Sequence, residues 1–350
     1  MTAPHRPRRR AAAIAAAAGA VLLPLLGGAA PAQAAGSFED GFTYERGADV
    51  RVPWIVGRTL RDGDTRISLD RGSRPYAVDR VARGWVVADT VPGRRANRVL
   101  HVAPDGTQRL LASTSIEYAL SSRGSLLATA TGEGRRSSVK VTDVASGEQV
   151  ARRTFRYSRV LGVDADRVLL QITAKRPRVA LWNYRENTLS LVARGPAYNA
   201  DLGVDRLIRS GNGPCDDTVV RVSDSSEIVA RMKRLRTLKW NDTGRRTLTT
   251  DCYFDSPYLQ RVIVRTDPGN KRVSALGGPN QDIKLSQPTW ESTRRYLVVR
   301  FDSKTAQVLR CDLRSRCVGA SRTYNTRLDR DGEGLNRPRI VLGGAFGGSF

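Results

Sequence analysis

The chain has 350 residues, 40% of them hydrophobic, and a formal net charge of +24 at pH 7. This hydrophobic content is sufficient for a packed core, and a single all-β domain can reach this length. Beyond the N-terminus no hydrophobic run is long enough for a membrane-spanning helix, which argues against a membrane span in the rest of the chain.

Residues 1–34 have the three parts of a signal peptide. A basic start contains Arg6, Arg8, Arg9 and Arg10, residues 11–26 are apolar, and Ala32-Gln33-Ala34 forms a cleavage site. We predict cleavage after Ala34, the alternative being an uncleaved anchor, and the export route stays open between Sec and Tat. Residues 35–350 would then form one secreted or envelope-associated domain, whose charge of about +20 favours polyanionic partners.

A short phrase recurs along the exported part, consisting of a polar turn followed by an apolar strand. Its anchor residues are Trp85, Leu126, Val168, Leu207, Thr247 and Tyr296. They are spaced by about 40 residues, which is typical of the four-stranded blade of a β-propeller. The repeat therefore predicts an all-β chain built from blades.

Hairpins follow these phrases in chain order, bounded by Gly, Pro, Asn, Asp or Ser. The predicted strand pairs are 98–103 with 107–112, 139–144 with 148–152, 179–184 with 188–193, 219–223 with 227–232, 261–266 with 272–276, and 308–312 with 317–320. One further hairpin, 54–61 with 65–70, comes before the first phrase and lacks two strands.

Two strands are left over at the end of the chain, at 320–326 and 338–342. A propeller must close its ring, because an open ring leaves sheet edges unpaired. We therefore expect both strands to form the inner pair of the blade whose outer pair is 54–70. This arrangement gives a seven-bladed β-propeller with one blade shared by the two ends of the chain, the alternative being six blades.

One segment carries a resemblance to a known group of proteins. Trp240-Asn241-Asp242-Thr243-Gly244-Arg245-Arg246 resembles the Trp-Ser-Pro-Asp-Gly-Lys/Arg phrase of TolB-like and WD40-like bacterial propellers. The abundance of Arg over Lys resembles that of actinobacterial proteins. The resemblance implies a secreted bacterial propeller, and it implies no particular activity because this fold hosts many functions.

The loops between the second and third strand of successive blades differ in charge. Three consecutive loops are basic and contain Arg94, Arg95, Arg135, Arg136, Lys175, Arg176 and Arg178, whereas the next three contain Asp216, Asp217, Asp251, Asp255 and Asp302. Since these loops share one face of a propeller, we predict an anion-binding surface there, with Arg suited to bidentate contacts. The alternative is ordinary solvated surface in an arginine-rich protein.

Four cysteines lie in the exported part, an even number that is typical of disulfides outside the cytoplasm. Cys311 and Cys317 flank the turn of one hairpin, and Cys215 and Cys252 lie on or beside loops of neighbouring blades. We predict the pairs 311–317 and 215–252. The spacings match no zinc pattern, so no metal site is expected.

Histidine is nearly absent, since the exported part contains only His101, on a predicted strand. This excludes multi-histidine metal centres and two-histidine mechanisms. The leading hypothesis is a non-catalytic, monomeric propeller without a cofactor that binds an anionic polymer or a protein at the cell envelope, with no specific nucleic acid. The alternative is a lactonase-like hydrolase in the central channel that uses carboxylates and calcium.

Overall fold

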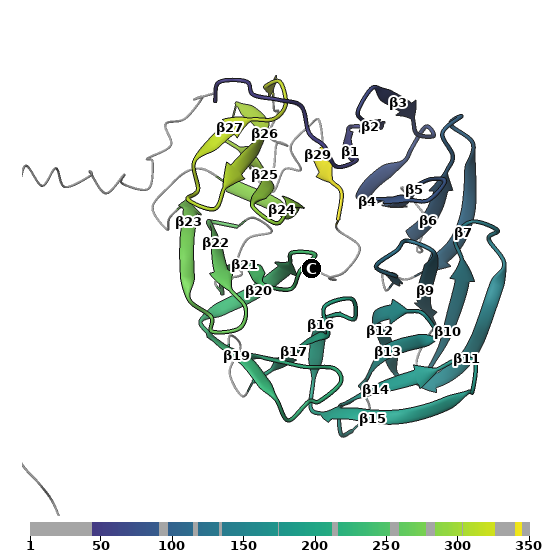
Figure 1. Ribbon diagram of the computed structural model, residues 1–350. Helices are drawn as coiled ribbons and strands as arrows, with labels where there is room; N and C mark the ends of the chain where they lie inside the picture. Colours follow the sequence, from purple (N-terminus) through teal and green to yellow (C-terminus); the bar gives the residue numbers. More distant parts are fainter. Residues whose placement is uncertain are drawn as a thin grey trace, which may run out of the picture. The chain divides into compact units, whose positions relative to one another are not determined.

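The computed structural model describes residues 44–90, 97–114, 118–132, 135–173, 175–211, 216–252, 259–277, 284–302, 304–325 and 340–344. These residues form seven antiparallel sheets arranged in a ring, which is a seven-bladed β-propeller (Figure 1). Among them, no helix is long and apolar enough to cross a membrane. The predicted fold class and the count of seven blades are therefore confirmed.

The first four blades have the following strands, given from the centre of the ring outward. Blade 1 consists of β29 (Ile340–Leu342), β1 (Trp54–Val56), β2 (Thr59–Asp62) and β3 (Thr65–Ser68). Blade 2 consists of β4 (Arg74–Val81), β5 (Gly84–Thr90), β6 (Asn97–Val102) and β7 (Gln108–Thr114). Blade 3 consists of β8 (Tyr118–Leu120), β9 (Leu126–Thr131), β10 (Arg136–Asp143) and β11 (Gln149–Arg156). Blade 4 consists of β12 (Ser158–Asp164), β13 (Arg167–Ile172), β14 (Arg178–Asn183) and β15 (Thr188–Arg194).

The other three blades follow the same order. Blade 5 consists of β16 (Ala197–Asp201), β17 (Arg206–Ser210), β18 (Asp216–Val220) and β19 (Ile228–Lys233). Blade 6 consists of β20 (Leu235–Trp240), β21 (Arg246–Asp251), β22 (Arg261–Thr266) and β23 (Arg272–Gly277). Blade 7 consists of β24 (Lys284–Ser292), β25 (Arg295–Phe301), β26 (Thr305–Asp312) and β27 (Cys317–Gly319), and β28 (Tyr324–Asn325) also pairs with β26.

The ring closes through blade 1, but not as the sequence predicted. Only β29 comes from the C-terminal part, and it pairs with β1 so that Ile55 lies opposite Val341. The predicted second inner strand is wrong, because β28 belongs to blade 7. The front segment supplies three strands instead of two, since Gly57 adopts a φ of 61° and turns the chain between β1 and β2. Positive φ is readily adopted by glycine, which explains the turn.

The hydrophobic core lies between neighbouring blades. Blades 3 and 4, for example, share one cluster in which Val139 and Val141 pack with Val168, Leu170 and Trp182. Each sheet must bury both faces against its neighbours, so the middle strands are buried almost throughout; the pattern of β13 is one exposed residue followed by five buried ones. The core thus fixes each blade and holds the loops at the two faces of the ring.

Two aspartates clasp neighbouring blades together. Asp62, the last residue of β2, accepts hydrogen bonds from Trp85 Nε1 at 2.8 Å and Arg80 Nε at 2.7 Å, both from blade 2. Asp267, after β22, accepts hydrogen bonds from Trp240 Nε1 at 2.7 Å and from Arg206 of blade 5. Arg206 and Asp267 are both buried. The carboxylates of Asp62 and Asp267 therefore have partners within the protein and join neighbouring blades.

The predicted disulfide between Cys311 and Cys317 is confirmed, and the two residues lie directly opposite each other on β26 and β27. Cys252 is also disulfide-bonded, whereas its predicted partner Cys215 lies outside the described residues.

The double variant Cys311→Ala/Cys317→Ala is expected to lose about 2 kcal/mol of unfolding free energy, because the crosslink restrains only a short loop of the unfolded chain. Urea unfolding followed by circular dichroism measures this loss. Val318→Ala, at the exposed position directly after Cys317, is the control that should change little. An unchanged urea midpoint in the double variant would contradict the expectation.

Candidate functional site

In each blade, the connection between the second and third strands lies on the same face of the ring as the connections between blades. Six of the seven second-to-third strand connections contain described residues. We call this the upper face, and the face carrying the other turns the lower face. Arg135 and Lys175 lie in two of these connections, and Arg136 and Arg178 begin the strands that follow them. The predicted loop positions are therefore those of the upper face.

Five of the seven predicted basic residues can be placed, and all five are exposed: Arg135, Arg136, Lys175, Arg176 and Arg178. They come from the adjacent blades 3 and 4. The other two, Arg94 and Arg95, lie outside the described residues.

Two further arginines join this group from the outer strands. Arg156, at the end of β11, lies directly opposite Arg136, and Arg194, at the end of β15, lies directly opposite Arg178. Both are exposed. We call the seven residues the basic edge. Sequence analysis missed Arg156 and Arg194 because it considered only loops, although a fourth strand always ends on the face where the second-to-third connections lie.

The basic edge has no carboxylate beside it among the described residues of blades 3 and 4. Their acidic residues, Asp143, Glu148, Asp164, Asp166 and Glu186, all lie at turns of the lower face. The described ion pairs involve other arginines. Glu133, in the connection after β9, lies outside the described residues. Like charges directly opposite each other on paired strands are unfavourable, so an external anion would relieve this repulsion.

The acidic half of the upper face is different, because its carboxylates are already engaged. Asp251 pairs with Arg261, and Asp302 pairs with Arg300 at 3.0 Å, both members of the second pair being buried.

Asp217, also on the acidic half, is buried and accepts a hydrogen bond from the Tyr198 hydroxyl. Burial raises the pKa of Asp217, and burial followed by the hydrogen bond to Asp217 raises the pKa of Tyr198. Asp217, Asp251 and Asp302 therefore have partners within the protein, whereas the described ion pairs include none of the basic-edge arginines.

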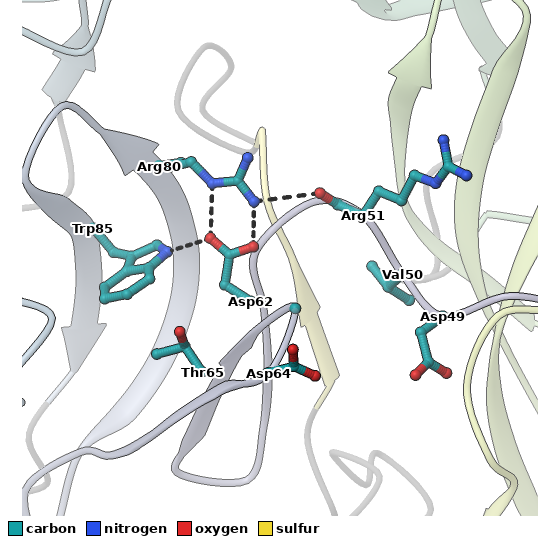
Figure 2. A pocket seen from close by; sticks show the side chains of 9 residues that line it. Asp49, Val50, Arg51, Asp62, Asp64, Thr65, Arg80 and Trp85 are labelled. Carbon is teal, nitrogen blue, oxygen red and sulfur yellow. Dashed lines mark hydrogen bonds and ion pairs between the residues drawn. The ribbon is translucent and has the colours of Figure 1, made fainter.

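A pocket of about 560 Å³ lies on the lower face between blades 1 and 2 (Figure 2). Its lining includes Asp49, Arg51, Asp64 and the clasp of Asp62 with Arg80. Figure 2 shows that the Asp62 carboxylate is occupied by Arg80 and Trp85, so it is a structural group and not a free one. No motif in the sequence indicated this pocket.

The described residues contain no group of three or more His, Cys, Asp or Glu side chains that could hold a metal ion. Gly344 contacts two inner strands. Its N–H donates to Asp79 of β4 at 2.7 Å, and its carbonyl accepts a hydrogen bond from Lys239 of β20. His101 lies on β6, away from the inner strands, and burial lowers its pKa.

No family model matches the sequence, and no curated protein matches it. Three solved structures are similar in fold. The β-propeller domain of the Trilobed protease from Pyrococcus furiosus is 10% identical with a TM-score of 0.50, over 72% of this chain and 86% of that one. The Swd1 β-propeller domain of Myceliophteria thermophila is 13% identical with a TM-score of 0.50, over 74% and 90%.

The third structure, from work on two prolyl endopeptidases, is 16% identical with a TM-score of 0.52. The match covers 73% of this chain and 43% of that chain, so this protein spans less than half its length. At such identities the likeness establishes the fold alone. The protein is a seven-bladed β-propeller, and the basic edge is its candidate binding site.

Proposed function

We propose that this protein is a secreted, non-catalytic propeller that binds an anionic polymer of the cell envelope through its basic edge. The observation that carries the proposal is the two pairs of directly opposite arginines, Arg136–Arg156 and Arg178–Arg194, with no described carboxylate on the upper face of their own blades 3 and 4. Like charges directly opposite each other on paired strands are destabilising without compensation, here as at Arg61–Arg66, Lys140–Arg152 and Arg265–Arg272. A phosphodiester polymer supplies that compensation, because Arg binds phosphate in a bidentate manner.

Rigidity supports the same function. Arg136, Arg156, Arg178 and Arg194 stand at strand ends of two blades that share one core, so little backbone ordering is needed at these positions when a polymer binds. A polymer with regularly spaced charges could contact both blades at once. Such binding would be strongly salt-dependent, since each neutralised phosphate releases a counterion.

The experiment is co-sedimentation of the purified protein with isolated cell envelopes. The basic-edge variant carries Arg135→Ala, Arg136→Ala, Arg176→Ala and Arg178→Ala. The lower-face variant carries Arg83→Ala, Arg123→Ala, Arg245→Ala and Arg294→Ala, which removes the same charge from exposed positions between first and second strands. We expect the basic-edge variant to bind at least about tenfold more weakly and the lower-face variant to bind nearly as the wild type does.

Both variants change only exposed side chains, so circular dichroism should confirm that they fold alike. An equal loss of binding in the two variants would show that net charge, and not the basic edge, governs binding. Unchanged binding in the basic-edge variant would contradict the proposal outright.

A further inference from the structure

The large exposed apolar side chains of the described residues all lie on the outermost strands of blades. They are Leu110 on β7, Val150 on β11, Leu189 and Leu191 on β15, Ile228 on β19, Val273 on β23 and Val318 on β27. An outermost strand is a sheet edge, and its unpaired N–H and C=O groups can pair with another chain unless charges, prolines or bulges prevent it.

β15 carries fewer protecting charges than β11 or β19. Its residues Thr188, Leu189, Ser190 and Leu191 are all exposed, and no charge, proline or glycine interrupts the strand before Arg194. The bulge of β15 lies at Val192, after this exposed run. β11 carries Arg152 and Arg153 in its middle, and β19 carries Arg231. Within the described residues, β15 ends the strand order of its sheet, so no further strand covers it.

The sequence around β15 is complementary to itself when two copies run antiparallel. If Ser190 lies opposite Ser190 of a second copy, Leu189 lies opposite Leu191 in both directions. The same register brings Glu186, exposed in the turn before β15, toward Arg194 of the second copy. Apolar pairs at the centre and opposite charges at both ends are the contacts that stabilise paired strands.

We propose that two copies of this protein associate through antiparallel pairing of their β15 strands around Ser190. Such an interface uses the same patch on both copies, as a two-fold dimer requires. It joins blade 4 of each copy into one continuous eight-stranded sheet. Main-chain hydrogen bonds hold the two strands together, as in other cases of strand addition.

The dimer goes beyond the proposed function and does not depend on it. It differs from the sequence-based expectation of a monomer. Pairing would neutralise Arg194 with Glu186 and leave the other residues of the basic edge free. The variants below change neither basic-edge arginines nor overall fold, so the two proposals can fail separately.

The first experiment is sedimentation velocity of the purified protein over a range of concentrations. The variant Leu191→Lys places one charge from each copy in the centre of the interface. The matched control Val150→Lys adds the same charge to each copy on the exposed face of β11, outside the interface. We expect a concentration-dependent dimer for the wild type and for Val150→Lys, and a dissociation constant at least about tenfold higher for Leu191→Lys.

The second experiment tests the register directly. A short bis-maleimide crosslinker should join two copies of Ser190→Cys efficiently, because the two thiols face each other across the two-fold axis. Thr188→Cys, two residues away on the same strand, should crosslink much less. A wild type that stays monomeric at all concentrations, a dimer that survives Leu191→Lys, or equal crosslinking of both cysteine variants would overturn the proposal.

Discussion

Replacing Val341 with Asp is expected to unfold the protein or to lower its unfolding free energy by at least about 4 kcal/mol. Val341 is fully buried in the centre of β29, where it packs in one cluster with Ile55, Leu60 and Val78. A buried unpaired carboxylate is costly, and it would also weaken the strand that closes the ring. Since whole domains are stable by about 5–15 kcal/mol, this single change consumes a large part of the total.

Urea unfolding or, for an insoluble product, the soluble yield measures the effect. Val341→Ala should remain folded with a loss of about 1–3 kcal/mol, because it removes methyl groups without adding a charge. Val150→Asp, at an exposed position, should change little. A Val341→Asp variant with the wild-type urea midpoint would show that β29 does not close the ring.

The variant Asp267→Ala is expected to lose about 3–5 kcal/mol of unfolding free energy. In the wild type, the Asp267 carboxylate accepts hydrogen bonds from Arg206 Nε at 3.1 Å, Arg206 Nη2 at 3.0 Å and Trp240 Nε1 at 2.7 Å. Both side chains of the ion pair are buried, so the change leaves a buried guanidinium and an indole N–H without their acceptor.

The matched control for Asp267→Ala is Asp49→Ala, which breaks the exposed pair with Arg46. Exposed pairs contribute about 0–1 kcal/mol, so the control should unfold almost as the wild type does. Thermal and urea unfolding of the two variants give the comparison. Equal stabilities would mean that the Asp267 clasp does not hold blades 5 and 6 together.

The repeated hairpins were predictable because each is local in sequence. The pairs β6–β7, β10–β11 and β14–β15 match the predicted strands closely, since apolar alternation and turn residues determine them within some 15 residues. The connections of the upper face followed from the same repeat. The five described basic residues lie in or beside those connections, and their role in binding stays a prediction.

The ring closure was harder to predict because it depends on pairing between distant segments. β29 has only three residues, and nothing local distinguishes it from β28 as a partner for β1. The split at Gly57 was missed because the run 54–61 is apolar enough for one strand. Cross-strand partners of the loop residues, such as Arg156, become visible only once register is known.

The most direct test of the basic edge is its contribution to salt dependence. A labelled poly(glycerol phosphate) would be titrated with the wild type, the basic-edge variant and the lower-face variant at about 50 to 300 mM salt. If the edge binds the polymer, the slope of log K against log salt should fall by about three for the basic-edge variant and by less than about one for the lower-face variant. Equal slopes for all three proteins would contradict the account and leave these arginines as solvated surface.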